Sequence, residues 1–366
     1  MLYRPTELDD RDVLDALKDW GIDAATADYA AVGFGDHHWT AADGDGHRWF
    51  VTVADLEQKS APGVSTDAAL EDLRRAMDTA ADLHEGTAAG HDGGTAEATG
   101  DGEPGTRNGT PGTRPTGDDD GLDFVVAPLR NTEGATVRRI GDRYALSVFP
   151  FTAGEPEGFG QEFDAAGRRK VVDLLAALHR RRPPESAPAR PPQVPGREGL
   201  DRALAETDRP WEAGPFSEAA RALLGGHAEG LRAGLARFDR LADQVARRSG
   251  DLVVTHGEPH RANLLWRADE GRFVLVDWDT AGLAVPERDL WQVTADPGDL
   301  ARYEAATGHT PDPAAMEMYR LRWDVEELVI YTGWFRAPHE RNADTEQAWT
   351  GLIESVERLA DRACDH

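Results

Sequence analysis

The chain has 366 residues, and its 40 Lys and Arg residues against 67 Asp and Glu residues give a formal net charge of −27. This charge argues against nucleic-acid binding through a basic surface, and a hydrophobic content of 40% argues against a wholly disordered chain. Cys364, the single cysteine, excludes an internal disulfide and a Cys-rich zinc site.

The sequence contains no apolar run of the kind found in signal peptides, and no segment approaches the ~20 apolar residues of a membrane span. We therefore expect a cytoplasmic protein whose partners include neither a membrane nor a nucleic acid. No feature of the sequence indicates a protein partner.

The first half of the chain has the pattern of a β-rich lobe with one internal helix. It begins with an amphipathic segment in which Thr6 and Asp9 have capping-box spacing. Ser65 or Thr66 is in place to cap the internal helix. In chain order we expect three short strands within 28–57 with glycine turns at 33–35 and 44–46, a helix over 66–84, and strands at 124–129, 135–140 and 143–151.

Residues 86–121 differ from everything around them, because eleven of these thirty-six residues are glycine and most others are Thr, Asp, Pro, Ala or Glu. Such a segment buries too little apolar area to offset its conformational entropy, so we predict a disordered surface insertion. It interrupts an N-terminal lobe that we place at residues 1–150.

The second half, residues 151–366, has the pattern of a mostly helical lobe that contains one β-hairpin. It opens with a connector at 151–160, and six prolines within 181–197 exclude a helix there. In chain order we expect a helix over 167–181, helical structure over 198–248, a strand at 252–255, a hairpin over 262–278, and helices near 314–334 and 345–363. The predicted fold class is therefore α+β, with two lobes.

Polar side chains are concentrated in residues 253–291. An apolar strand leads into a loop that carries His256, Glu258 and Asn263, and the second strand of the hairpin ends on Asp277 and Asp279. Carboxylates at the end of an apolar strand are costly unless they serve a purpose, and Mg²⁺ prefers a few hard oxygen ligands. An Asn and an Asp from neighbouring loops meet that need, and a carboxylate five residues before the Asn can accept a hydroxyl proton.

The segment HGEPHRANLL followed by VDWD resembles the catalytic segment of the aminoglycoside phosphotransferase family, whose pattern is H-G-D-x-H-x-x-N and then [I/V]-D-[W/F]-[D/E]. The continuation GLAVPERDLW, residues 282–291, is similar to its spectinomycin-phosphotransferase-like members. The resemblance implies a two-lobed protein-kinase-like fold. It also implies ATP and Mg²⁺ as cofactors and O-phosphorylation of an aminoglycoside or aminocyclitol antibiotic, and hence antibiotic resistance.

The resemblance assigns roles to matching residues in this segment. Glu258 stands at the catalytic-base position, and Asn263 and Asp277 stand at the magnesium-ligand positions. By the same correspondence, His256 supports the catalytic loop and Asp289 holds its backbone.

The resemblance also implies nucleotide contacts in the first lobe. The turn containing Gly33 and Gly35 would cover the phosphates. The segment 148–154, with Phe149 and Phe151, would be the hinge whose backbone meets the adenine.

Two positions depart from the family pattern. Glu258 replaces an aspartate and is one methylene longer, and a misplacement of ~1 Å can cost ~10²-fold in rate. Thr52 stands where the family places a lysine on the third strand. Arg48, on the same strand face, or Lys59, just beyond the strand, is a candidate substitute.

The acidic surplus points to a hydroxylated acceptor that is cationic. Asp324 and Glu327 lie in one expected helix beside Trp323, which can stack on a ring, and Asp279 is a further candidate for acceptor contact. The same charge also serves solubility, and tryptophans in such a helix also pack cores.

Three other hypotheses remain open. One is a kinase for another small metabolite, such as choline, a sugar or a nucleoside antibiotic. A second is a nucleotide-binding module with impaired catalysis, which the Glu258 and Thr52 departures would explain. The third is a hydrolytic metal site made by His256, Glu258 and His260, which alternate along the chain.

Overall fold

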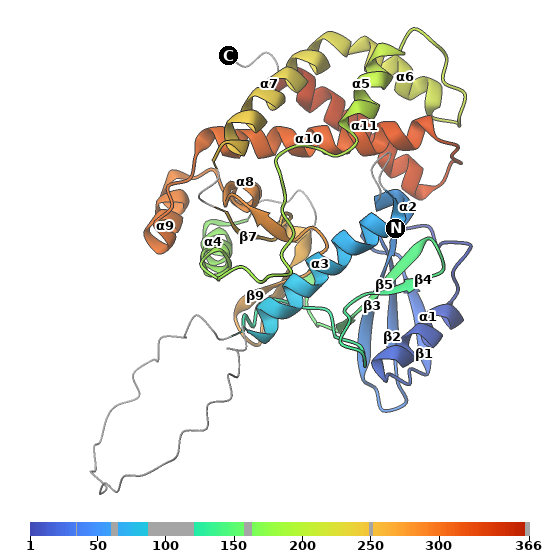
Figure 1. The fold of residues 1–366 in the computed structure, drawn as a ribbon, viewed down its shortest axis with the longest axis vertical. Helices are drawn as coiled ribbons and strands as arrows, with labels where there is room; N and C mark the ends of the chain where they lie inside the picture. The colour runs from blue at the N-terminus through green and yellow to red at the C-terminus, as the bar shows by residue number, and fades with distance from the viewer. Residues whose placement is uncertain (34, 60–64, 87–120, 157–162, 249–251, 363–366) are drawn as a thin grey trace, which may run out of the picture.

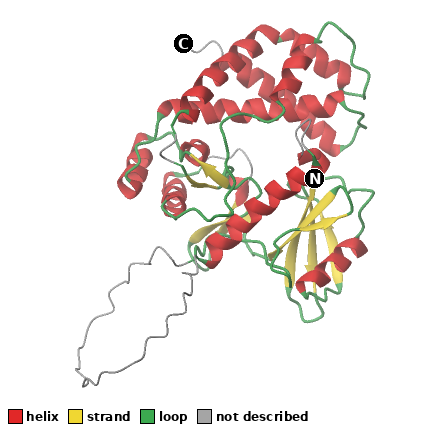
Figure 2. Cartoon of the chain, viewed as in Figure 1, coloured by secondary structure: helices red, strands yellow, loops and turns green. Residues whose placement is uncertain are grey.

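The computed structural model describes residues 1–33, 35–59, 65–86, 121–156, 163–248 and 252–362, and every structural statement below concerns these ranges. They form two lobes, with the strands of the smaller lobe on one side and most helices on the other (Figures 1 and 2). The α+β class predicted from the sequence is thereby confirmed. The predicted glycine-rich insertion lies almost entirely outside the described residues.

An antiparallel sheet with strand order β1-β2-β3-β5-β4 forms the smaller lobe. Alternating side chains of the middle strands, such as Trp39, Val51 and Val53, are fully buried on one face, as expected for a half-buried strand. Its strands are β1 (Thr26–Ala30), β2 (His37–Ala42), β3 (Arg48–Asp55), β4 (Arg138–Ile140) and β5 (Tyr144–Pro150). The three strands predicted within 28–57 are therefore confirmed.

Helix α1 (Asp10–Leu17) packs on the outer face of this sheet, where Val13 and Leu17 are fully buried (Figure 1). Its capping box is made by Asp9 and Asp12, and the predicted pairing of Thr6 with Asp9 is wrong. The Asp9 carboxylate accepts hydrogen bonds from the N–H groups at the second and third helical positions, so the helix begins immediately after Asp9.

Two helices follow β3, namely the single turn α2 (Leu56–Lys59) and the long α3 (Thr66–Glu85). The Ser65 hydroxyl accepts a hydrogen bond from the Ala68 N–H and caps α3, as predicted. In Figure 1, α3 lies between the sheet and the larger lobe. Its Arg75 guanidinium donates to the carbonyls of residues 186 and 187, so α3 is attached to both lobes.

The strand predicted at 124–129 is wrong. Val125 makes one isolated bridge with Leu275 of the larger lobe, whereas Leu129 N–H donates to the Val148 carbonyl of the smaller lobe. Because its backbone groups find partners on two different sheets, the segment crosses between the lobes and forms no ladder of its own.

The larger lobe is mostly helical and is organised around α10, which packs against α5, α7, α8 and α11. The predicted helices near 167–181, 198–248, 314–334 and 345–363 are confirmed. Helices α8 and α9 are short and were missed by sequence periodicity. The helices are α4 (Ala165–His179), α5 (Arg197–Ala205), α6 (Ser217–Gly226), α7 (Ala228–Ala246), α8 (Glu287–Val293), α9 (Pro297–Thr307), α10 (Pro313–Arg336) and α11 (Ala343–Arg362).

Two small sheets lie between the helices and the smaller lobe. The predicted hairpin is present as β8 paired with β9, and the predicted strand at 252–255 pairs with β10, which was not predicted. The strands are β6 (Glu155–Pro156), β7 (Val253–Thr255), β8 (Leu264–Arg267), β9 (Arg272–Leu275) and β10 (Gly282–Ala284). Within the described ranges, no helix is both long and apolar enough to cross a bilayer.

Candidate active site

The loop that follows β7 is held by a buried carboxylate on α8. Asp289 accepts hydrogen bonds from the backbone N–H of His256 at 2.8 Å and of Gly257 at 2.6 Å. His179 of α4 lies 3.0 Å from the same carboxylate. Burial alone would raise the pKa of Asp289, but the hydrogen bond with His179 and the charge of Arg288 hold it below its usual range. An ionised acceptor therefore fixes the start of the loop.

His256 connects this loop to the end of β9. Its Nε2 lies 2.9 Å from the Val276 carbonyl, and its Nδ1 accepts the Glu258 N–H at 3.1 Å. Burial lowers the pKa of His256 to about 4, so the ring is neutral, with the proton on Nε2. Because both ring nitrogens are occupied by backbone groups, His256 cannot join Glu258 and His260 around a metal ion. The alternating metal site considered above is therefore wrong.

Only glycine fits at position 257, because the Arg288 side chain leaves no space for a Cβ atom. The φ of Gly257 is +101°, and a Cβ at this position would collide with the Arg288 guanidinium. Arg288 is itself buried and donates to the Thr255 hydroxyl at 2.8 Å and the Thr280 carbonyl at 2.9 Å. The Arg288 guanidinium thus donates hydrogen bonds to the strand before the loop and to the turn after β9, and packs against the loop itself.

Asn263 and Asp277 are brought together by the hairpin. Leu264 pairs with Leu275, and the N–H of Val276 donates to the Asn263 carbonyl at 3.0 Å, so Asp277 follows directly after Asn263's backbone partner. The Asn263 side-chain NH₂ donates to the Glu258 carbonyl at 3.0 Å, which leaves its amide oxygen as the remaining ligand atom.

Asp277 has an unusual backbone. Among the described residues, Asp277 is the only residue other than glycine with a positive φ, at +68°. Such conformations are uncommon outside glycine and concentrate at functional sites. Its side chain is accessible to solvent although dense structure surrounds it. The backbone strain is consistent with a carboxylate that must be presented to a ligand.

Several carboxylates crowd around Asp277. Desolvation by the surrounding protein first, and then the negative charges of Asp279, Glu258 and Asp36, raise the pKa of Asp277 well above its usual value. Nearby positive charge would relieve this repulsion. The amide oxygen of Asn263 and this carboxylate are hard ligands from adjacent turns, so the residues present fit a Mg²⁺ ion.

Lys59 links this acidic cluster to the smaller lobe. Its Nζ lies 2.5 Å from Oδ2 of Asp279 and 3.1 Å from Oδ1 of Asp36. Burial would lower the pKa of Lys59, but these two carboxylates raise it well above its usual value. Asp36 follows the turn in which Gly33 and Gly35 both have positive φ, at +70° and +98°. The predicted phosphate turn is therefore joined to the acidic end of the hairpin.

The other predicted nucleotide contacts lie further along the sheet. The Arg48 guanidinium stacks on the Phe151 ring, 3.6 Å from its centroid, at the hinge end of β3. Thr52, in the middle of β3, is buried, and its hydroxyl lies 3.3 Å from Nδ1 of His38. Phe149 belongs to the core that packs on α3. Of the two candidate substitutes for a strand lysine, only Lys59 contacts the acidic cluster.

A cavity of about 580 Å³ lies beside the loop that follows β7 in the larger lobe. His260 lines it and places its Nε2 3.6 Å from the Glu258 carboxylate. Trp323 of α10 lines it as well, with its ring 6.1 Å from that of His260 and 6.0 Å from that of Trp291. This cavity is concave, partly aromatic and next to the Glu258 loop, features that suit the binding of a small molecule.

The charges of Asp324 and Glu327, which also line this cavity, are balanced within the protein. Asp324 accepts a hydrogen bond from Arg358 at 2.6 Å and another from Arg362 at 2.8 Å. Glu327 accepts from Arg358 at 2.8 Å. These two carboxylates are therefore already neutralised and offer little net charge to a cationic acceptor.

Sequence reasoning missed three groups at this site. Asp36 and the contact that it makes with Lys59 were not anticipated, although Asp36 directly follows the glycine turn. Trp291 lines the cavity, and Gln292 donates to the Gly257 carbonyl at 3.0 Å. Both lie in the short helix α8, where no periodicity marked a functional face.

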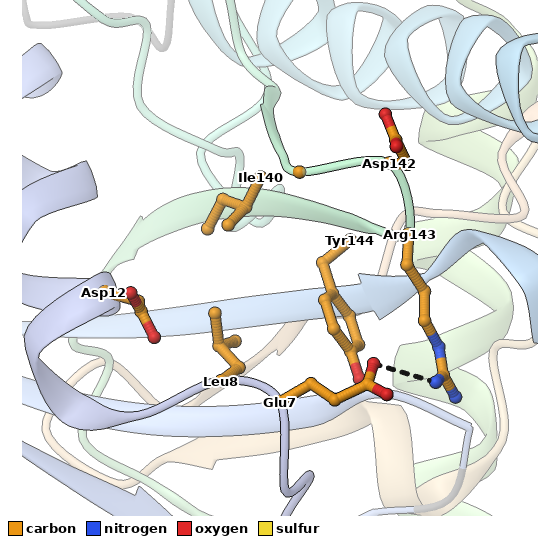
Figure 3. Close-up of a pocket in the computed structure, with 8 residues that line it drawn as sticks. Glu7, Leu8, Asp12, Ile140, Asp142, Arg143 and Tyr144 are labelled. Atoms are coloured by element: carbon orange, nitrogen blue, oxygen red, sulfur yellow. Dashed lines mark hydrogen bonds and ion pairs between the residues drawn. The ribbon is translucent and has the colours of Figure 1, made fainter.

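A smaller hollow of about 210 Å³ lies on the smaller lobe, between the segment before α1 and the β4–β5 turn (Figure 3). Glu7 and Arg143 form an ion pair across it at 3.1 Å. It contains none of the candidate site residues. The cavity beside Glu258 is therefore the better candidate for substrate binding.

Comparisons with known proteins agree with this geometry. A sequence model described as "Phosphotransferase enzyme family" matches residues 125–319, which is more than half of the chain. No curated protein matches the sequence. Among solved structures, spectinomycin phosphotransferase, APH(9)-Ia, in complex with ADP and spectinomycin is 15% identical, with a TM-score of 0.65 over 97% of this chain and 98% of that one.

Two metabolite kinases are also similar in fold. A microcompartment-associated aminopropanol kinase is 14% identical, with a TM-score of 0.56 over 96% of this chain and 98% of that one. An ethanolamine kinase from Plasmodium vivax is 9% identical, with a TM-score of 0.53 over 96% of this chain and 88% of that one. The TM-scores show a shared fold, and at such low identities the acceptor of this chain stays open.

Proposed function

The chain belongs to the phosphotransferase enzyme family, and from that premise we propose that it transfers the γ-phosphoryl group of ATP to a hydroxyl group of a small cyclic acceptor. The observation that carries the proposal is the meeting of Asn263, Asp277 and the Glu258 loop at one end of the hairpin, next to the glycine turn. Because ATP is the donor, we place the reaction in the cytoplasm.

Glu258 is the proposed acceptor of the hydroxyl proton. As the acceptor oxygen bonds to the γ-phosphorus, the bond between that phosphorus and the bridging oxygen breaks, ADP leaves, and the hydroxyl proton passes to the Glu258 carboxylate. The neighbouring His260 ring at 3.6 Å helps to orient that carboxylate.

Asn263 and Asp277 are the residues that would hold Mg²⁺. When bound, this ion supplies positive charge to the phosphate oxygens and a fixed position for the reacting group. The backbone pairing of Asn263 with Val276 and the left-handed backbone of Asp277 keep the two ligands beside each other. Positioning and charge are the main contributions that proteins make to phosphoryl transfer.

Gly33 and Gly35 are the proposed cover over the phosphates. Their positive φ values are readily adopted by glycine, and Asp36, which directly follows Gly35, pairs with Lys59. Phe151 and its backbone mark the hinge at which we place the adenine, next to Arg48.

We propose an aminocyclitol or aminoglycoside antibiotic as the acceptor, which would make the protein an antibiotic-resistance enzyme. The shared fold with spectinomycin phosphotransferase supports this choice. The volume of about 580 Å³ and the pair of tryptophans at the cavity suit a ring better than a two- or three-carbon amino alcohol. Kinases of such amino alcohols share the fold and define the alternative.

The test is ADP release from Mg·ATP in the presence of spectinomycin, other aminoglycosides, aminopropanol and ethanolamine. We expect a cyclic acceptor to stimulate ADP release and to appear as a phosphorylated product by mass spectrometry, and we expect EDTA to abolish both. Stimulation only by the amino alcohols would replace the proposed acceptor. ATP binding without any acceptor-dependent ADP release would identify a nucleotide-binding module.

A further inference from the structure

The middle of β3 lacks a cation for the nucleotide. ATP sites of kinase-like folds place positive charge next to the phosphates. Thr52 is neutral here, and its hydroxyl is engaged with His38 at 3.3 Å. Arg48 stacks on Phe151 at the hinge end of the strand, four residues away from Thr52. The proposed ATP site therefore needs a cation from outside β3.

The one-turn helix α2 supplies a lysine at the required place. Lys59 ends α2 and extends its ammonium group between Asp36, which follows the glycine turn, and Asp279, which lies two residues after Asp277. The two contacts come from opposite lobes and from the segments that would hold the phosphates and the metal ion.

We propose that Lys59 binds the phosphate groups of the nucleotide in place of a β3 lysine, an assignment that rests on the proposed function. Its ammonium group has three N–H donors, of which one donates to Asp279, while Asp36 is an ion-pair partner at 3.1 Å whose Oδ1 accepts no hydrogen bond from the described residues. A phosphate oxygen takes one of the two remaining donors. Asp36 thus holds the lysine in position before the nucleotide arrives, and Asp279 keeps it beside Asp277.

The chemistry of lysine suits this role. A compact ammonium group on a flexible side chain can exchange one oxygen partner for another. A planar guanidinium instead favours a bidentate arrangement of two acceptors. Lys59 contacts Asp36 and Asp279, beside the segments proposed to hold the phosphates and the metal ion. Its contribution is therefore expected for the phosphates and not for the adenosine moiety.

The experiment measures binding of Mg·ADP and of adenosine to the full-length wild type and to Lys59→Met. We expect the dissociation constant for Mg·ADP to rise roughly 10- to 100-fold, the value of one hydrogen bond to a charged group, and the constant for adenosine to stay unchanged. Lys59→Arg should restore only part of the ADP affinity, because the charge of a planar guanidinium is spread over three nitrogens and that of an ammonium group is compact.

Lys18→Met is the matched control. Lys18 is an exposed lysine that pairs with Asp15 three residues away, on the outer side of the smaller lobe. We expect it to bind ADP and adenosine as the wild type does. Since Lys59→Met leaves Asp36 and Asp279 without their partner, thermal unfolding of each variant is recorded as well. If the single variant is unfolded, Lys59→Met with Asp36→Asn removes both charges and should show the same selective loss of ADP affinity.

The outcomes separate the two proposals. A folded Lys59 variant that binds Mg·ADP as tightly as the wild type overturns the assignment of Lys59, while ATP-dependent turnover by the wild type would still stand. Equal losses for ADP and adenosine would show that Lys59 acts only on the structure, and would also overturn it. A wild type that binds no Mg·ATP would instead refute the proposed function itself.

Discussion

The two acidic residues nearest the proposed reaction differ in how the protein holds them. Glu258 lies in a loop and does not have a positive φ, and its side chain, which is 35% exposed, pairs with the His260 ring at 3.6 Å. Asp277 is fixed by a strained backbone at the end of β9. Glu258 can therefore adjust its longer side chain to an acceptor, whereas Asp277 must present its carboxylate at one position.

This difference predicts unequal effects of mutation. We expect Asp277→Ala to lower kcat by roughly 10³-fold or more, because it removes a proposed metal ligand. Glu258→Gln should lower kcat by only roughly 10- to 100-fold, because positioning and charge compensation dominate phosphoryl transfer. Initial rates of ADP release with saturating acceptor measure both. Adenosine binding should be the same in the two variants and serves as the control. An equal or larger loss for Glu258→Gln would contradict the expectation and raise the importance of the base.

Among the elements, the short helix α8 has an influence on the site out of proportion to its seven residues. Asp289 holds the backbone of the loop after β7, Arg288 fills the space under Gly257, and Gln292 donates to the Gly257 carbonyl. Trp291 lines the proposed acceptor cavity. A shift of α8 would therefore move the loop and the cavity wall together.

We expect Asp289→Asn to be strongly destabilising, because its amide would turn an NH₂ group toward one of the N–H donors that the carboxylate now accepts. Breaking a buried charged network of this kind costs about 3–5 kcal/mol. Urea unfolding measures the loss, and kcat should fall with it. Asp173→Asn is the control, because Asp173 forms a half-exposed pair with Arg302 worth less than about 1 kcal/mol. Similar losses in the two variants would be evidence against the anchoring role of Asp289.

Elements with a clear local pattern were predictable, and those that depend on distant partners were not. The helical pattern over 66–84 and the cap at Ser65 identified α3 from the sequence. The apolar run at 124–129 looked like a strand, but its backbone partners lie on two sheets. Strand β10 is three residues long and exists because β7 is beside it.

For the whole molecule, buried neutral histidines make stability depend on pH. Burial lowers the pKa of His37 to about 4 and that of His38 to about 3, from an ordinary value of 6.5. Below pH 6.5 the unfolded chain therefore binds more protons than the folded one at these positions. Stability that is present at neutral pH is lost as the pH falls from 6.5 toward 4.

Each of these histidines should cost about 1 kcal/mol of unfolding free energy between pH 6.5 and pH 5.5. Urea unfolding at the two pH values measures the change. In His37→Gln the change should be smaller by about that amount, since the contributions of all other groups are shared with the wild type. A stability that rises on acidification, or an identical pH dependence in the variant, would be inconsistent with a neutral buried His37.

The α+β class, the Ser65 cap and the periodicity of the longer helices followed from the sequence alone, and so did the choice of Glu258, Asn263 and Asp277 as the proposed functional set. They did so because such features depend on neighbours within a few residues, or on motif order. The contact between Lys59 and Asp279 spans 220 positions, and the neutralisation of Asp324 by Arg358 and Arg362 joins two helices. Only tertiary structure decided these contacts, because the strength of an ion pair depends on distance through space, which local sequence patterns do not encode.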